Sequence, residues 1–239
     1  MRFTSVIVAS CVAALVGCGG GERDETPSDR EAVEAVLDLR WDLAAEAFRA
    51  MSGRSFVEQQ LLEVWRGDGE RAYARTEVAY RAGTQVRSTT IDSSGAFQSS
   101  WTERLIATPD TFAVPFGHWL DGEPPYRSSR RRDEFRFTSL PDTAMDGTTV
   151  RRYRVSAREE EGALRSVTFL AIPDSNQVVG FTEVRRETAP FFAQDSELTV
   201  DLAPTDSGWA PRTIVLDVTV DPPAREPRRY RVSRLMIHN

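Results

Sequence analysis

The pattern of apolar residues changes its period near Gly69, and this change divides the chain into a helical part and a strand part. Before Gly69, apolar residues recur at helical spacing in two runs. The first run follows the capping pattern Ser28-Asp29-Arg30-Glu31 and continues to about Ala50. The second run follows the capping pattern Ser55-Phe56-Val57-Glu58 and places Leu61, Val64 and Trp65 on one stripe. The sequence therefore predicts two helices within residues 29–66.

After Gly69, apolar and polar residues alternate, which indicates strands that bury one face. Turn sequences such as Asp146-Gly147 and Glu161-Gly162 separate the runs, and connections this short favour antiparallel neighbours. The predicted fold is α+β: two N-terminal helices packed on a large, curved, mainly antiparallel sheet that covers residues 70–239. The expected strands are 72–80, 84–92, 96–106, 134–140, 148–158, 165–172, 177–186, 196–203, 212–221 and 228–237.

Residues 107–133 interrupt the alternation with four prolines and four aromatic residues. Loops of this length inside a compact domain are often lids or binding loops. Phe112, Phe116 and Trp119 are spaced as on one side of a helical turn, so they are our candidates for a hydrophobic lid. The alternative is that these rings are permanent core that covers an open end of the sheet.

The first residues combine a charged Met1-Arg2, an apolar run over 6–16 and the sequence Leu15-Val16-Gly17-Cys18. The apolar run is shorter than the roughly 20 residues that span a bilayer. The four-residue sequence resembles the lipobox of bacterial lipoproteins. That resemblance implies a signal peptide over 1–17, a lipidated Cys18 and a location in the cell envelope, anchored to the outer membrane and facing the periplasm or the cell surface. Residues 18–28 would form a flexible tether, and 29–239 a single domain.

Composition excludes several kinds of chemistry. The net charge of −6 does not favour binding to nucleic acid. Every basic residue is Arg, so neither a Schiff-base lysine nor a phosphate-loop lysine is present. The cysteines are Cys11, which leaves with the signal peptide, and Cys18, which the lipid occupies. The mature domain therefore has no disulfide and no thiol nucleophile.

We find no pattern of catalytic or metal-binding residues. His118 and His238 are the two histidines, and no nucleophile motif accompanies either. The acidic run 159–161 lies at an expected turn, where a solvated tip is the simplest interpretation. Arg127 and the run 130–132 form a basic patch that would either contact phosphate headgroups or belong to a solvated loop. We expect a protein that is not an enzyme and needs no metal or cofactor.

The C-terminal half resembles the LolA/LolB-like half-barrel superfamily over roughly residues 70–239. The resemblance rests on a strand over 167–172, a polar turn at Pro173-Asp174, a returning strand over 178–184 and the Gly208-Trp209-Ala210-Pro211 sequence that opens the next strand. It implies a curved sheet whose concave face holds acyl chains, and hence binding of a lipid or another hydrophobic ligand. Two alternatives stay open: a protein-interaction or envelope-assembly lipoprotein with a filled core, and an NTF2-like small-molecule-binding domain.

The lipobox resemblance gives the first testable prediction. Mass spectrometry of the mature protein should find an N-terminus at Cys18 with a mass increase that corresponds to a diacylglycerol group and, in most cases, an amide-linked acyl chain. Two or three chains would hold the protein on the membrane, because each buried CH₂ contributes about 0.8 kcal/mol. A mature protein that retains Met1, or that carries an unmodified Cys18, would contradict the assignment.

Overall fold

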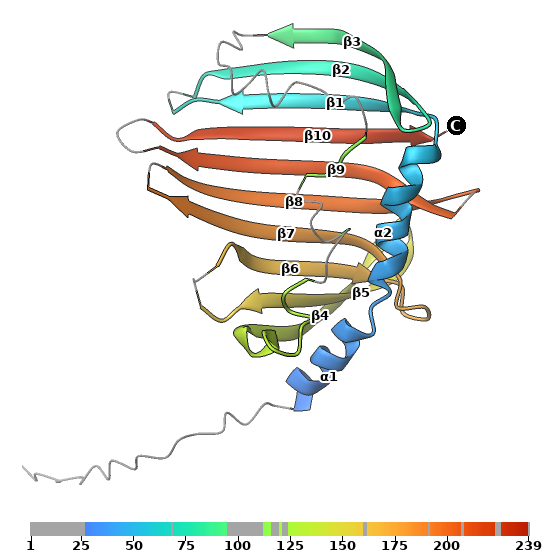
Figure 1. Ribbon diagram of the computed structural model, residues 1–239, viewed down its shortest axis with the longest axis vertical. Coiled ribbons are helices and arrows are strands. Elements are labelled where there is room, and N and C mark those ends of the chain that lie inside the picture. Colours follow the sequence, from blue (N-terminus) through green and yellow to red (C-terminus); the bar gives the residue numbers. More distant parts are fainter. Residues whose placement is uncertain are drawn as a thin grey trace, which may run out of the picture.

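The computed structural model describes residues 27–67, 69–94, 112–115, 120, 124–159, 162–190, 192–206, 208–222 and 226–238. These residues form one antiparallel sheet of ten strands in the order β3-β2-β1-β10-β9-β8-β7-β6-β5-β4 (Figure 1). The strands are β1 (Phe56–Trp65), β2 (Arg71–Arg81), β3 (Thr84–Ser94), β4 (Phe135–Met145), β5 (Thr148–Ala157), β6 (Leu164–Ala171), β7 (Val178–Ala189), β8 (Phe192–Thr205), β9 (Gly208–Asp221) and β10 (Arg228–His238).

The predicted fold class is confirmed: the sheet is curved and unclosed, and two short helices pack against it. Strands β4 to β10 follow one another as neighbours, and β10 returns to pair with β1. The N-terminal strands β1 to β3 thus extend the sheet beyond its C-terminal strand. Nine of the ten expected strands lie at β2 to β10; the expected strand 96–106 lies outside the described residues.

The first expected helix is present but divided into α1 (Pro27–Leu37) and α2 (Trp41–Arg49), and a short 3-10 helix, η1 (Ala50–Gly53), follows. The break has a tertiary cause. The Arg40 N–H donates to the Asn176 carbonyl at 2.8 Å, in the turn between β6 and β7. That contact takes Arg40 out of the helix and lets Trp41 begin a second one against the sheet.

The second expected helix, over 55–66, was a wrong prediction, because these residues form β1. Strand β1 lies between β2 and β10, and its apolar residues are distributed over both faces. This distribution imitates helical spacing. The expected helix end at Gly67 to Gly69 is instead the turn of the β1–β2 hairpin, where Gly69 has a φ of 83°.

One face of the sheet is apolar, and α1 and α2 pack on it; we call it the inner face. The cross-strand register assigns to it alternate residues of each strand, and these are mostly buried. The outer face carries arginine–carboxylate pairs between neighbouring strands, such as Arg229 with Asp217. Buried side chains of the inner face include Phe56, Val64, Val78, Phe137, Val155, Val167, Phe169, Phe181, Leu198, Val200, Ile214 and Val218.

No helix among the described ranges is long and apolar enough to cross a bilayer. The division of the chain into a signal peptide, a tether and one domain stays a prediction.

Trp41 is the largest side chain that α2 contributes to the inner face, and its ring lies edge-on to Phe169 and Phe181 at centroid distances of 5.4 and 5.0 Å. Replacing Trp41 with Ala should therefore lower the free energy of unfolding by about 3–5 kcal/mol in urea titrations. The control is Val86→Ala on β3, whose side chain is 58% exposed. That change should cost less than about 1 kcal/mol. Equal effects of the two changes would show that α2 is not part of the core.

Candidate functional site

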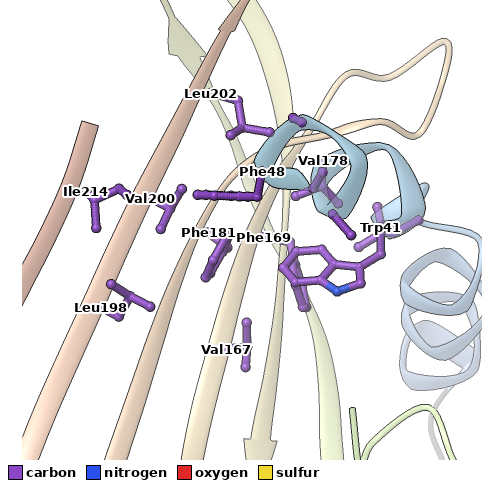
Figure 2. Close-up of a cluster of buried hydrophobic side chains, with 14 of the residues drawn as sticks. Trp41, Phe48, Val167, Phe169, Val178, Phe181, Leu198, Val200, Leu202 and Ile214 are labelled. Atoms are coloured by element: carbon purple, nitrogen blue, oxygen red, sulfur yellow. The ribbon is translucent and has the colours of Figure 1, made fainter. Parts of the chain in front are cut away.

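The end of the inner face beneath α2 is filled by the protein itself. Figure 2 shows Trp41 of α2 next to Phe169 and Phe48 of α2 next to Val200, with Phe181 between them on the sheet. All five side chains are at most 8% exposed. Edge-on aromatic pairs at these distances are favourable arrangements, so this end of the face is a packed core. A ligand would have to bind elsewhere on the face.

The opposite end of the inner face has a pocket of about 620 Å³. It lies where β4 and β6 begin and where β5 and β7 end, far along these strands from α2 (Figure 1). Its volume is within the range of roughly 300–1,000 Å³ that small-molecule sites occupy. The lining combines apolar and charged side chains: Pro125, Arg131, Asp133, Glu134, Phe135, Ala157, Arg158, Glu159, Gly162, Ala163, Leu164 and Arg185. We call it the β4–β7 pocket.

A charged pair is buried at the inner side of this pocket. The Arg185 guanidinium donates to the Glu183 carboxylate at 3.0 Å, and the two side chains are 17% and 6% exposed. Tyr126 lies nearby, with its ring edge-on to Phe135 and Phe169. Burial, followed by the negative charge of Glu183, raises the pKa of Tyr126, so its hydroxyl stays neutral at physiological pH. The Glu183–Arg185 pair therefore places charged groups where the apolar inner face meets the pocket, which Arg185 lines.

A second buried pair lies toward the other edge of the sheet, between β1 and β10. Arg234 donates both to the Glu58 carboxylate and to the Ala113 carbonyl. The two charged side chains are 8% and 0% exposed, so water does not solvate this pair. Burial, followed by the negative charge of Glu58, raises the pKa of the neighbouring Tyr80. Arg234 thus joins the sheet to the insertion at residues 112–115.

Of the three lid candidates, only Phe112 lies in the described part of the chain; Phe116 and Trp119 lie outside it. The Phe112 N–H donates to the Gly83 carbonyl at 3.0 Å. Its ring lies edge-on to Phe56 at 5.4 Å and is 4.9 Å from the Arg234 guanidinium. These contacts hold Phe112 against β1 and the turn between β2 and β3. The action of the three residues as a lid stays a prediction.

The arginine patch serves mainly to hold the protein together. Arg127 donates to the carbonyl of Leu37, the last residue of α1, and to the carbonyl of Leu39 in the link between α1 and α2. Arg131 forms a two-pronged pair with Glu134 of the 3-10 helix η2 (Arg132–Glu134). Arg130 is exposed. The patch therefore supplies few uncommitted charges for a ligand.

The described residues contain no group of three or more His, Cys, Asp or Glu side chains that could hold a metal ion. His238, at the end of β10, lies with its Nε2 at 2.7 Å from the Pro211 carbonyl. His118 lies outside the described residues. A hollow of about 370 Å³ on the outer face is lined by Leu61, Ile91 and Leu235 among others.

No protein-family model matches the chain, and no curated protein matches it. Among solved structures, a DUF1329 family protein from Desulfovibrio piger is 10% identical and has a TM-score of 0.29, with 90% of this chain and 94% of that one covered. A structure named as an outer membrane lipoprotein-sorting protein domain, from Vibrio parahaemolyticus, is 10% identical with a TM-score of 0.30, over 87% and 91% of the two chains.

A LolA superfamily protein from Nitrosomonas europaea is 7% identical with a TM-score of 0.27, over 90% of this chain and 94% of that one. Its name is that of the superfamily which the sequence resembles. Likeness at this level of identity and TM-score assigns neither a family nor a function to this chain.

The Glu58–Arg234 pair gives a prediction about stability. Arg234→Met should lower the free energy of unfolding by roughly 3–5 kcal/mol, because it leaves the Glu58 carboxylate buried without its partner. The double variant Glu58→Leu/Arg234→Met should recover most of that loss. Arg229→Met, which removes an exposed pair with Asp217, is the matched control and should cost less than about 1 kcal/mol. A double variant as unstable as Arg234→Met would show that the unpaired charge is not the cause.

Proposed function

We propose that this protein is a lipid-anchored lipoprotein of the cell envelope that binds a lipid or another hydrophobic ligand on the inner face of its sheet, without catalysing a reaction. The observation that carries the proposal is the β4–β7 pocket. It opens at the end of an apolar face that α2 covers only at the opposite end. Sites for small hydrophobic molecules are usually concave and apolar, with a few polar groups that fix orientation.

The apolar side chains of the inner face continue beyond the pocket, where the protein itself buries them. Phe135 of β4 and Leu164 of β6 line the pocket and belong to the hydrophobic core or pack against it. Val155 and Val167 follow on the same face of β5 and β6 and are buried. An acyl chain that enters at the pocket could replace contacts along this row, and each CH₂ that leaves water would contribute about 0.8 kcal/mol.

The anchor and the tether support the assignment to the envelope. A lipidated Cys18 would place the membrane within reach of the domain, because the chain from Gly19 to Thr26, which precedes α1, is rich in glycine and charge. A Gly-rich chain of eight residues has an average end-to-end distance of about 5–6 Å × √8, or roughly 16 Å. The domain would therefore work close to the lipid surface that supplies its ligand.

The second candidate function is an envelope protein that contacts other proteins and has a filled core. The observation in its favour is the packing of Trp41 and Phe48, which are at most 8% exposed and lie against buried side chains of the sheet. The two candidates differ in whether a small hydrophobic molecule occupies the inner face at the β4–β7 end.

Native mass spectrometry after gentle extraction should show the protein together with a bound lipid. Ala163→Trp places a large ring in the β4–β7 pocket, and its spectrum should lose the bound mass. Ala144→Trp, at an exposed position on β4, should retain it. If wild type and both variants have only the mass of the lipidated chain, under conditions that preserve a known carrier–lipid complex, the ligand-binding proposal is wrong and the filled-core candidate is favoured.

A further inference from the structure

The charged side chains of the β4–β7 pocket fall into two sets, those that pair with one another and those that do not. Arg131 is paired with Glu134, and Arg185 with Glu183 and Glu187. Within the described ranges, the terminal nitrogens of Arg158 and the carboxylates of Asp133 and Glu159 make no ion pair or hydrogen bond. Among the lining residues that the structure describes, the uncommitted charges are thus one cation and two anions.

Arg158 is held in position although its charge is uncommitted. Its Nε donates to the Phe135 carbonyl at 2.9 Å, and its backbone N–H donates to the Glu134 carbonyl at 2.8 Å. The guanidinium is therefore fixed at the mouth of the pocket, next to Phe135, the first residue of β4. Fixed guanidinium groups with free terminal nitrogens suit phosphate oxygens, because their donors match the geometry of the anion.

We infer that the β4–β7 pocket binds the headgroup of a zwitterionic phospholipid that carries a primary ammonium. Its phosphate would contact Arg158, and its ammonium would lie between Asp133 and Glu159. This inference rests on the proposed function, since the acyl chain of the same lipid would occupy the inner face. Phe135 and Leu164 form the boundary at which the polar lining meets the apolar face.

The charges discriminate between headgroup classes. An anionic headgroup without an ammonium would satisfy Arg158 but would face two uncompensated carboxylates, and like charges placed together are unfavourable. A simple fatty acid would leave both carboxylates without a cation. A soluble phosphate compound would gain nothing from the apolar part of the lining. The zwitterion satisfies both signs of charge and the apolar wall.

The test measures displacement of a fluorescent acyl probe from protein purified from cells that express the complete chain. The competitors share one acyl chain and differ in headgroup: lysophosphatidylethanolamine, lysophosphatidylglycerol and the uncharged monoacylglycerol. Free phosphoethanolamine and inorganic phosphate are the competitors without a chain. The wild-type protein should bind the ethanolamine lipid about tenfold more tightly than the other two lipids, which is the effect of one charge-assisted hydrogen bond. Phosphoethanolamine should compete weakly, and inorganic phosphate not at all.

Two variants and one control assign the preference to the pocket. Arg158→Gln should weaken the ethanolamine lipid about tenfold and leave monoacylglycerol unchanged. The double variant Asp133→Asn/Glu159→Gln should remove the preference for lysophosphatidylethanolamine over lysophosphatidylglycerol. Arg136→Gln, at an exposed position on β4 that faces away from the inner face, should behave as wild type.

The possible failures are distinguishable. If all three lipids bind equally well and the pocket variants match wild type, the headgroup site is refuted and the proposed function stands. A preference for lysophosphatidylglycerol over lysophosphatidylethanolamine also refutes the headgroup assignment. So does competition by inorganic phosphate that is as strong as competition by phosphoethanolamine. If no lipid displaces the probe and the probe itself does not bind, the proposed function fails, and the headgroup site fails with it.

Discussion

The rest of the structure depends on one constraint: a ten-stranded sheet with one apolar face has to cover that face, and the chain supplies few helical residues to do so. Helices α1 and α2 contain 11 and 9 residues. They pack on β4, β7 and β9 toward one end of the strands (Figure 1). Trp41 and Phe48 cover much of the sheet surface beneath α2 because their rings are large. The described parts of the insertion add the partly buried side chains of Phe112, Val114 and Leu120. Coverage is therefore divided between the helices and the insertion, and the β4–β7 end is left with a pocket.

The inner face also buries charged side chains, next to the insertion and next to the β4–β7 pocket. Two ion pairs lie on the inner face, Glu58 with Arg234 and Glu183 with Arg185. Burying a charge costs free energy unless a partner compensates it. Such pairs therefore add little net stability, but each charged side chain has to stay next to its partner. Arg234 of the first pair also donates to the Ala113 carbonyl and so holds this part of the insertion against β10. The second lies beside the β4–β7 pocket, where the apolar face meets the charged loops, and gives that end the mixed character that an amphiphilic ligand requires.

The alternation of residues after Gly69 predicted β2 and β4 to β10 because each of these strands buries alternate residues on one face. It also predicted β3, although none of the residues of that strand is buried. The same logic failed for 55–66, because β1 is a central strand with apolar residues on both faces. Glu58 made the failure worse: it completes a helix-capping pattern, whereas its real partner is Arg234, 176 residues away. No local signal reports such a pair, nor a pocket whose lining comes from residues 125–185. Phe112 was found because an aromatic, proline-rich insertion is visible locally, although its contacts with Phe56 and Gly83 are not.

The account's central claim is that the inner face at the β4–β7 end is the site where a lipid chain binds. Photo-crosslinking with a phospholipid that carries a diazirine on its acyl chain, followed by peptide mapping, tests this claim most directly. The account predicts crosslinks to β4 and β6 around Phe135, Leu164 and Val167, which line the pocket or continue from it along the inner face. Crosslinks confined to exposed apolar residues of the outer face, such as Leu235 and Ile237, would contradict it and would show that lipid contacts only the surface of the sheet.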